Sequence, residues 1–159
     1  MDFVLSNLLF KKMQFWSYEK LVDHYWRIPS DIYHHDLMPN IEVTENWLKP
    51  VIQQFKENVN TVAIQPKLLD FKDKTKFEYA GAGGGFMDQL GYPYCRGRIF
   101  HTLEEDHGQY NDQKEVFWAS GACLFIRTNV FNNLGGFDSR FFAHMEEIDL
   151  CWRAKNKGL

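Results

Sequence analysis

The sequence predicts an α/β fold in which a mixed sheet is flanked by helices. Segments with the pattern of strands alternate along the chain with segments that have the pattern of helices, and this order is typical of α/β proteins. The chain has 159 residues, of which 45% are hydrophobic. That length suits one domain, and that apolar content can build a core and excludes a disordered chain.

The N-terminal part of the chain, residues 1–39, is predicted to be a separate helical segment. Apolar residues recur at steps of three and four over residues 3–26, the spacing of one helix face, and Pro29 would end this helix. We expect the helix to pack on the domain. The alternative is a helix that lies on a membrane surface, because aromatic residues, leucines and lysines occur together, although Glu19 and Asp23 dilute any basic face.

The next unit contains a strand, a helix and a second strand. "NIEV" at residues 40–43 is a short strand, and Thr44 is placed to cap a helix over residues 45–58. Pro50 falls inside that helix, either near its start or at a kink. The segment "TVAIQPKLL" at residues 61–69 predicts a strand that ends near Pro66.

The central part of the chain is rich in glycine and then becomes apolar. Residues 79–98 carry six glycines, which predicts a loop or a set of turns. Residues 116–127, "VFWASGACLFIR", are β-branched, aromatic and apolar, so they predict a buried strand. Gly121 interrupts it and indicates a close approach of the backbone to another group.

Two helices are predicted in the last third of the chain. Residues 128–138 predict a short helix that is stopped by Gly135 and Gly136. The last helix should run from about residue 145 to residue 157, with Gly158 as its C-terminal stop.

Composition excludes several classes of protein. The net charge of −3 and the pI of about 6.1 offer no clustered basic face for nucleic acid. The three cysteines have no C-x-x-C spacing, so neither a zinc site nor a disulfide framework is supported, and buried thiols in a reducing compartment are the simplest interpretation. No apolar run approaches the roughly 18 residues of a membrane span, and the N-terminus lacks the features of a signal peptide. We therefore expect a cytoplasmic protein.

The last helix concentrates its carboxylates at one end. Glu146, Glu147 and Asp149 occupy its first turn and basic residues occupy its second half, which is the arrangement that the helix dipole favours. Asp149 and Arg153 also form an i,i+4 pair. A purely structural role therefore accounts for the whole cluster.

A catalytic role is the alternative for the same cluster. Glu147 points about a quarter-turn away from the helix face that the neighbouring carboxylates share, and Ile148 and Trp152 form an apolar ridge beside it. A carboxylate at a helix N-terminus beside apolar walls is suited to act as a general base.

Three other motifs carry weaker signals. Asn40 and Glu42 lie two apart at a strand end and offer two oxygen ligands to a hard divalent ion, although a turn asparagine beside a surface glutamate explains them as well. The glycines of residues 81–85 lack the Gly-Lys-Ser/Thr of a phosphate loop, so turns are favoured. Two histidine clusters lack a second spaced ligand, and a surface or capping role is favoured for both. They comprise His34, His35 and Asp36, and His144 with Glu146.

The order of these segments resembles the family 2 glycosyltransferases, especially their bacterial rhamnosyltransferase-like members. The likeness covers residues 40–159 and lies in "NIEVTENWLKPVI", "VAIQPKLL", "FEYAGAGGGFMDQLGYPYCRGRIF" and, most specifically, the segment from "FWASGACLFIR" to "MEEIDLCWRAKNKG". The resemblance implies a partial GT-A fold, the middle and acceptor-side portion of such a domain. Residues 1–39 do not resemble the nucleotide-binding half that usually comes first, so the N-terminal helix is atypical.

The resemblance also implies roles for individual residues. Glu147 matches the position of the catalytic base, usually an aspartate, and Glu146 matches the acidic residue before it. Asn40 and Glu42 match the ends of the Asp-x-Asp signature, which holds Mg²⁺ or Mn²⁺ on a nucleotide diphosphate. The substrate-binding residues implied are Gly121, Ala122, Trp118 and Asp149.

The function implied is metal-assisted inverting transfer of a sugar from a nucleotide-diphosphate donor to an acceptor hydroxyl, in the synthesis of cell-surface polysaccharide. The acceptor would be a glycan or a lipid-linked glycan, and the enzyme would be peripheral at the inner face of the membrane. The alternative is a catalytically inactive module that binds a partner or assembles with a second copy, because an incomplete sheet leaves edges that need cover.

Overall fold

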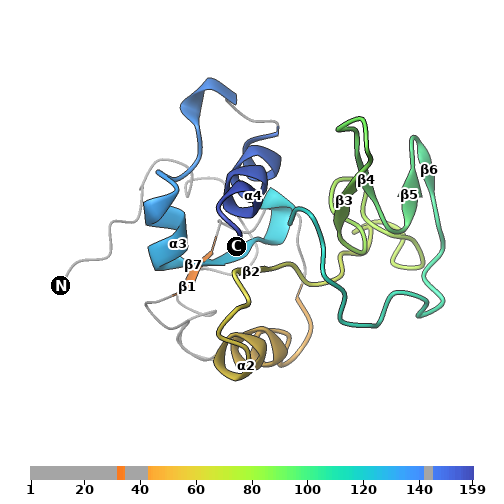
Figure 1. Ribbon diagram of the computed structural model, residues 1–159. Coiled ribbons are helices and arrows are strands. Elements are labelled where there is room, and N and C mark those ends of the chain that lie inside the picture. The colour runs from red at the N-terminus through yellow and green to blue at the C-terminus, as the bar shows by residue number, and fades with distance from the viewer. Residues whose placement is uncertain (1–31, 35–42, 142–144) are drawn as a thin grey trace, which may run out of the picture.

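The computed structural model describes residues 32–34, 43–141 and 145–159. The predicted helix over residues 3–26 and the metal ligands Asn40 and Glu42 lie outside these residues. The described residues contain both helices and strands, as predicted, and the strands form two small sheets (Figure 1). The predicted alternation is not kept throughout, because the strands between residues 63 and 103 follow one another without a helix.

The first sheet has three strands in the order β1-β7-β2. These are β1 (Ile32–His34), β7 (Phe125–Arg127) and β2 (Ala63–Ile64), and both neighbours of β7 run antiparallel to it. The prediction of a mixed sheet is therefore wrong for the described residues, where every strand pair is antiparallel.

Helix α2 (Leu48–Glu57) covers one face of this sheet. It is amphipathic, and its buried residues pack against Phe125 of β7. The predicted N-terminus was three residues too early. Trp47 is the N-cap and no side chain of the described residues caps the helix, so Thr44 does not have the predicted role. Pro50 lies in the first turn, where its missing N–H costs no intrahelical hydrogen bond.

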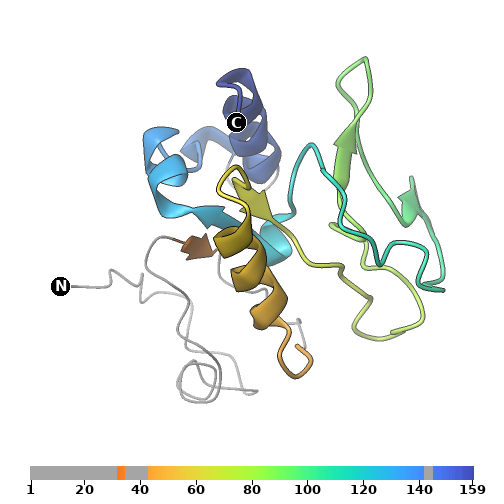
Figure 2. The ribbon, with the colours of Figure 1, turned by 60° about the horizontal axis from the view of Figure 1, so that its bottom comes forward.

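Helices α3 (Thr128–Asn133) and α4 (Glu146–Asn156) lie across the sheet from α2 (Figures 1 and 2). Ile126 packs with Val130 of α3 and Leu150 of α4, whereas its neighbour Phe125 packs toward α2. Successive side chains of a strand point to opposite faces, so β7 joins two layers of core. Both predicted C-terminal helices are confirmed, and Gly135, Gly136 and Gly158 after them have the positive φ that favours glycine.

The second sheet is an antiparallel meander where the sequence predicted only a loop and turns. Its strands, in the order β3-β4-β5-β6, are β3 (Gly85–Met87), β4 (Pro93–Cys95), β5 (Arg98–Ile99) and β6 (Thr102–Leu103). The glycine-rich segment contains these strands because Gly91 and Gly97, with φ of +85° and +90°, make the turns between them.

The predicted buried strand over residues 116–127 is a strand only at its end. Trp118 forms an isolated bridge with Gly85, and residues Gly121–Cys123 form a 3₁₀ turn, η2, before β7 begins. A second 3₁₀ turn, η3, spans Ser139–Phe141. The indole of Trp118 occupies the space that a side chain at Gly85 would need, with ring atoms 2.2 Å from the position of a Cβ. This close approach fastens the meander to the rest of the fold.

The cysteines and the lengths of the helices test two predictions made from composition. Cys95, Cys123 and Cys151 are all buried free thiols, as predicted. In the described part of the chain, the helices are too short or too polar for any of them to cross a membrane.

Candidate functional site

The candidate site is built around the first turn of α4. Met145, immediately before the helix, has a φ of +73°, and this left-handed residue turns the chain sharply into the helix. The acidic residues of the first turn and the basic residues Arg153 and Lys155 near the end complement the helix dipole, as the sequence predicted.

Asp149 is held by an ion pair within α4. Its Oδ2 accepts a hydrogen bond from Nε of Arg153 at 2.8 Å, which confirms the predicted i,i+4 pair. The guanidinium of Arg153 also donates to the carbonyl oxygens of Leu134 and Gly136. The pair therefore ties α4 to the turn after α3, and this is where the structure places the predicted substrate-binding residue Asp149.

Glu147 and Gly121 lie side by side. A Cβ at Gly121 would be 3.9 Å from Cδ of Glu147, at ordinary van der Waals distance, and no other atom outside the neighbouring residues comes within 4 Å of it. The side chain of Glu147 is half-buried. The predicted close approach of the backbone at Gly121 is therefore wrong, because a side chain would fit there, and the neighbour across this space is the carboxyl group that sequence reasoning assigned as the base.

Glu146 is placed differently from Glu147. Its Oε2 atom is buried and has no hydrogen-bond partner among the described residues. Next to it, Ile148 is buried, whereas Trp152 is partly exposed and meets Phe117 edge-on with ring centroids 5.6 Å apart. The predicted apolar ridge beside the carboxylates is therefore present, with one end covered by Phe117.

Gln65 positions the turn that carries Gly121, a role that sequence reasoning missed. Its Oε1 accepts a hydrogen bond from the N–H of Ser120 at 2.6 Å, and its Nε2 donates to the carbonyl oxygen of Gly81 at 2.9 Å. Ser120 is buried, and its Oγ accepts from the N–H of Ala122. The one available signal was a glutamine at the end of an otherwise apolar strand, directly before Pro66.

The other two predicted substrate-binding residues point into the core. The side chain of Ala122 is buried in the cluster that α2 covers. Trp118 is buried against the meander, and its indole N–H donates to the carbonyl oxygen of Phe86 at 2.9 Å. Of the residues predicted to bind substrate, Gly121 is the one that the described structure brings against Glu147.

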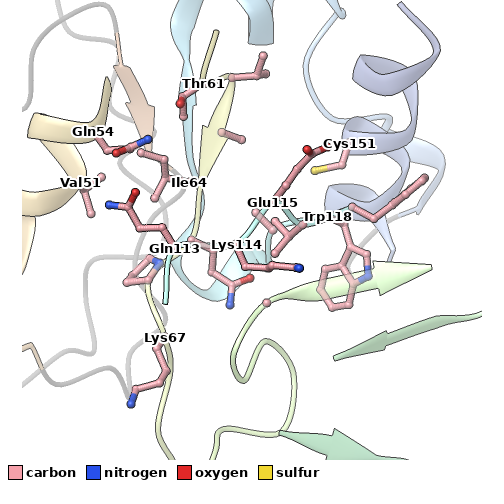
Figure 3. A pocket seen from close by; sticks show the side chains of 18 of the residues that line it. Val51, Gln54, Thr61, Ile64, Lys67, Gln113, Lys114, Glu115, Trp118 and Cys151 are labelled. Atoms are coloured by element: carbon pink, nitrogen blue, oxygen red, sulfur yellow. The ribbon is translucent and has the colours of Figure 1, made fainter. Parts of the chain in front are cut away.

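A cavity of about 810 Å³ lies between α2, β2, the end of α4 and residues 110–119 (Figure 3). Its volume is in the range of ligand pockets. Trp118 and Cys151 contribute to its wall, but Glu147 and Gly121 do not. Most of its charged side chains form ion pairs: Arg96 with Asp112 and Lys155 with Glu115 within the lining, and Lys67 with Asp106 outside it. We therefore centre the candidate site on Glu147, where geometry and residue chemistry agree, rather than on this cavity.

The cysteines near the site are poor nucleophiles. Burial raises the pKa of Cys151 to about 11 and that of Cys123 to about 12. The pKa of Cys95 is also raised, chiefly by burial, and the negative charge of Glu147 contributes to the shift at Cys95 and at Cys151. Because the thiolate is the reactive form, these buried thiols serve packing rather than nucleophilic chemistry.

The predicted metal ligands cannot be placed, because Asn40 and Glu42 lie outside the described residues. Within the described ranges, no group of three or more histidine, cysteine, aspartate or glutamate side chains is arranged to hold a metal ion. Mg²⁺ and Mn²⁺ at residues 40–42 therefore stay a prediction.

Comparison with known proteins points to sugar transfer. Over 75 residues the chain is 47% identical to an N-acetylglucosaminyl-diphospho-decaprenol L-rhamnosyltransferase of Mycobacterium tuberculosis, which covers 47% of the chain. Over 123 residues, or 77% of the chain, it is 35% identical to the low-salt glycan biosynthesis hexosyltransferase Agl10 of Haloferax volcanii. The chain is similar to glycosyltransferases.

A third relative extends the comparison to another polysaccharide. The O-antigen biosynthesis protein RfbC of Myxococcus xanthus is 28% identical over 117 residues, or 74% of the chain. The chain spans 24%, 36% and 9% of the lengths of the rhamnosyltransferase, the hexosyltransferase and RfbC. No protein-family model and no solved structure matches the chain.

Proposed function

We propose that this chain is part of a family 2 glycosyltransferase of the GT-A type, which moves a sugar from a nucleotide-diphosphate donor to an acceptor hydroxyl with inversion. The similarity to a rhamnosyltransferase and a hexosyltransferase supports the reaction class. The contact between Gly121 and Glu147 is the observation that carries the assignment of the base.

Glu147 would act as the general base. In an inverting transfer, the acceptor oxygen forms a bond to the anomeric carbon while the bond from that carbon to the diphosphate breaks. The acceptor hydroxyl proton passes to Oε of Glu147, and the nucleotide diphosphate leaves with the bonding electron pair. Gly121 suits this step, because a residue without a side chain leaves room beside the carboxylate for the hydroxyl.

The surroundings of Glu147 support the same role. The side chain is half-buried, with the apolar residue Ile148 beside it on α4. Gln65 and Ser120 hold the turn that carries Gly121, so this side of the contact is in place before any substrate arrives. A preorganised wall beside the base helps to orient the acceptor hydroxyl.

The donor diphosphate would be held with a divalent ion. Asn40 and Glu42 offer an amide and a carboxylate oxygen, which suit a hard cation such as Mg²⁺ or Mn²⁺. When bound there, the ion would neutralise charge that develops on the leaving diphosphate.

The acceptor would be a glycan, free or linked to a lipid, at the cytoplasmic face of a membrane. The Mycobacterium relative is named for an N-acetylglucosaminyl-diphospho-decaprenol, and the other two relatives are named for glycan and O-antigen biosynthesis. We carry the shared chemistry of these acceptors, a sugar hydroxyl in cell-surface glycan synthesis, to this chain.

A transfer assay and a binding assay test the proposal together. The chain is titrated with UDP or dTDP plus Mn²⁺ by calorimetry, and transfer from radiolabelled nucleotide sugars is measured with wild type, Glu147→Gln and Glu115→Gln. Glu115 is an exposed carboxylate that pairs with Lys155 and serves as the control. We expect Glu147→Gln to lower kcat by about 10²–10⁴, as for loss of a general base, with unchanged nucleotide binding, and Glu115→Gln to transfer normally.

Two results would overturn the proposal. Equal kcat values for Glu147→Gln and wild type would remove Glu147 as the base. Absence of any heat at millimolar nucleotide would remove donor binding by this chain and favour the inactive, partner-binding module.

A further inference from the structure

Two turns of the meander lie at the same end of the second sheet. In an antiparallel meander successive turns alternate between the two ends, so the β3–β4 turn and the β5–β6 turn share one end. In Figure 1 both turns lie at the upper ends of the labelled strands, on the side of the molecule away from α2 and α3. The β4–β5 turn, at the opposite end, packs Gly97 against the buried ring of Phe77.

The β3–β4 turn presents an aliphatic side chain to solvent. Leu90 is 83% exposed and Tyr92 is also exposed. The turn is held by Asp88, whose carboxylate accepts hydrogen bonds from the backbone N–H groups of both residues at 2.8 Å. Leu90 is therefore displayed on an ordered turn.

The β5–β6 turn presents two apolar side chains in the same way. Ile99 is exposed, and Phe100 is 84% exposed with a φ of +51°. A bulky residue in this left-handed conformation is an outlier, because glycine or asparagine adopts it at lower energy. The guanidinium of Arg98 donates to the carbonyl oxygen of Phe100 and lies over the ring of Tyr79 at 4.5 Å. The fold therefore tolerates a strained, exposed phenylalanine that contributes little to its own core.

We propose that the exposed side chains of these two turns insert into the interfacial layer of a lipid bilayer. We call them the tip residues: Leu90, Tyr92, Ile99 and Phe100. Apolar side chains that protrude singly from ordered turns gain free energy when they leave water for acyl chains. Tyrosines, with an apolar ring and a polar hydroxyl, favour the level of the headgroups. Tyr79, Tyr92 and Tyr94 are exposed on the same sheet or beside it.

Other occupants fit these residues less well. A second copy of the chain would need a broad complementary surface, of the order of 1,000 Å² or more in total for a stable pair, whereas the tips are two narrow protrusions. A glycan would stack on aromatic rings, but Leu90 and Ile99 have none. A bilayer admits protrusions of any shape and suits both aliphatic and aromatic side chains.

The charges at the tips predict little dependence on lipid charge. Asp88 is a carboxylate at the first turn and Arg98 a cation at the second, so their contributions oppose each other. Beside the second turn, Nδ1 of His101 lies 3.4 Å from the hydroxyl of Tyr79. Attraction to anionic headgroups therefore contributes little, and apolar insertion should dominate.

Co-sedimentation with vesicles tests the proposal. The full chain is mixed with vesicles of phosphatidylcholine alone or with about 30 mol% phosphatidylglycerol, in low salt and in about 0.5 M NaCl, which screens surface charge. We expect similar binding in all four conditions. The triple variant Leu90→Ser, Ile99→Ser, Phe100→Asn should bind about tenfold less or weaker still, since each substitution removes apolar surface from the contact.

Two further variants make the result interpretable. Val59→Ser removes a side chain that is 80% exposed in the turn between α2 and β2, and it should bind vesicles like wild type. Phe100→Asn alone places a residue that favours this φ and should fold at least as well as wild type, so its weaker binding cannot come from unfolding. Thermal denaturation of each variant checks the fold.

Several outcomes would overturn the proposal. They are vesicle binding that survives in the triple variant, binding that requires phosphatidylglycerol and disappears in high salt, no binding by wild type, and a dimer in light scattering that the triple variant abolishes. The inference goes beyond the proposed sugar transfer. Because no donor or acceptor is present in this experiment, its failure is separate from failure of the transfer assay.

Discussion

The backbone of Gly121 faces the carboxyl group of Glu147 across 3.9 Å, measured from the position of a Cβ to Cδ. These two residues are far apart in the sequence. They meet because η2 directly precedes the central strand β7, and Glu147 lies in the first turn of α4, the helix that packs on that strand. Side chains can therefore be introduced at Gly121, beside the carboxylate, without a change in the protein core.

Larger side chains at Gly121 should block the approach to Glu147. In Gly121→Ala the new Cβ makes an ordinary contact, so we expect a free energy of unfolding within about 1 kcal/mol of wild type, as for glycine replacement at a compatible position. In Gly121→Val the added methyl groups would occupy the place of the acceptor hydroxyl and lower kcat/KM for the acceptor by about tenfold or more. Acceptor kinetics of Gly121→Val equal to those of wild type would contradict this use of the space.

Replacement of Gly85 by alanine should destabilise the fold, unlike the same replacement at Gly121. A Cβ at Gly85 would lie 2.2 Å from two ring atoms of Trp118, which is itself buried. Overpacking of this kind typically costs about 1–3 kcal/mol. Urea denaturation of Gly85→Ala should therefore show a lower midpoint, with Gly121→Ala as the matched control that leaves it nearly unchanged.

Local signals explain which parts of the fold were predictable. Helix α4 was expected from residue 145 to residue 157 and spans Glu146–Asn156, because its end charges and Gly158 act within one or two turns of the helix. The meander was missed because its strands are only two or three residues long, too short for alternation to be recognised. The fit of Trp118 against Gly85 depends on tertiary packing, which spacing along the chain does not reveal.

The candidate site was predictable to a similar degree. Family resemblance indicated Glu147 and Gly121, and the structure brings them together. Gln65 was not indicated, because a side chain that joins Ser120 to Gly81 acts only once all three segments have folded. Ala122 and Trp118 belong to the same sequence segment as Gly121, yet their side chains point into the core. Successive residues of this segment face different directions.

Replacement of Arg153 by lysine should be strongly destabilising. The guanidinium of Arg153 donates to Asp149, to the carbonyl oxygen of Leu134 and to that of Gly136. A lysine ammonium cannot reach this planar set of acceptors. Because a hydrogen bond to a charged group is worth about 1.5–3 kcal/mol, we expect Arg153→Lys to lose about 2–4 kcal/mol in urea denaturation.

Arg140 provides the matched control for this substitution. It also donates to a carboxylate, that of Asp138, through two nitrogen atoms, but its side chain is 87% exposed. Exposed ion pairs contribute little to stability. Arg140→Lys should therefore denature like wild type, and an equally large loss in both variants would show that the loss at Arg153 does not come from its partly buried contacts.

The ion pair between Lys67 and Asp106 should make stability depend on pH. Nζ of Lys67 lies 2.5 Å from Oδ2 of Asp106, and both side chains are partly buried. The hydrogen bond from Lys67 is the main reason that the pKa of Asp106 lies below its ordinary value of 3.8. The folded state therefore favours the ionised form of Asp106. The pair stabilises the fold above pH 3.8, and this contribution is lost as the pH falls through the lowered pKa of Asp106. Asp106→Asn should cost about 1 kcal/mol at neutral pH, since solvent still screens this partly buried pair, and the difference from wild type should close in acid. In a Lys67→Met background, most of this pH-dependent difference should disappear. Urea denaturation from pH 2.5 to pH 7, roughly the range over which carboxylates titrate, measures it, and a constant difference between wild type and Asp106→Asn would rule out linkage to this carboxylate.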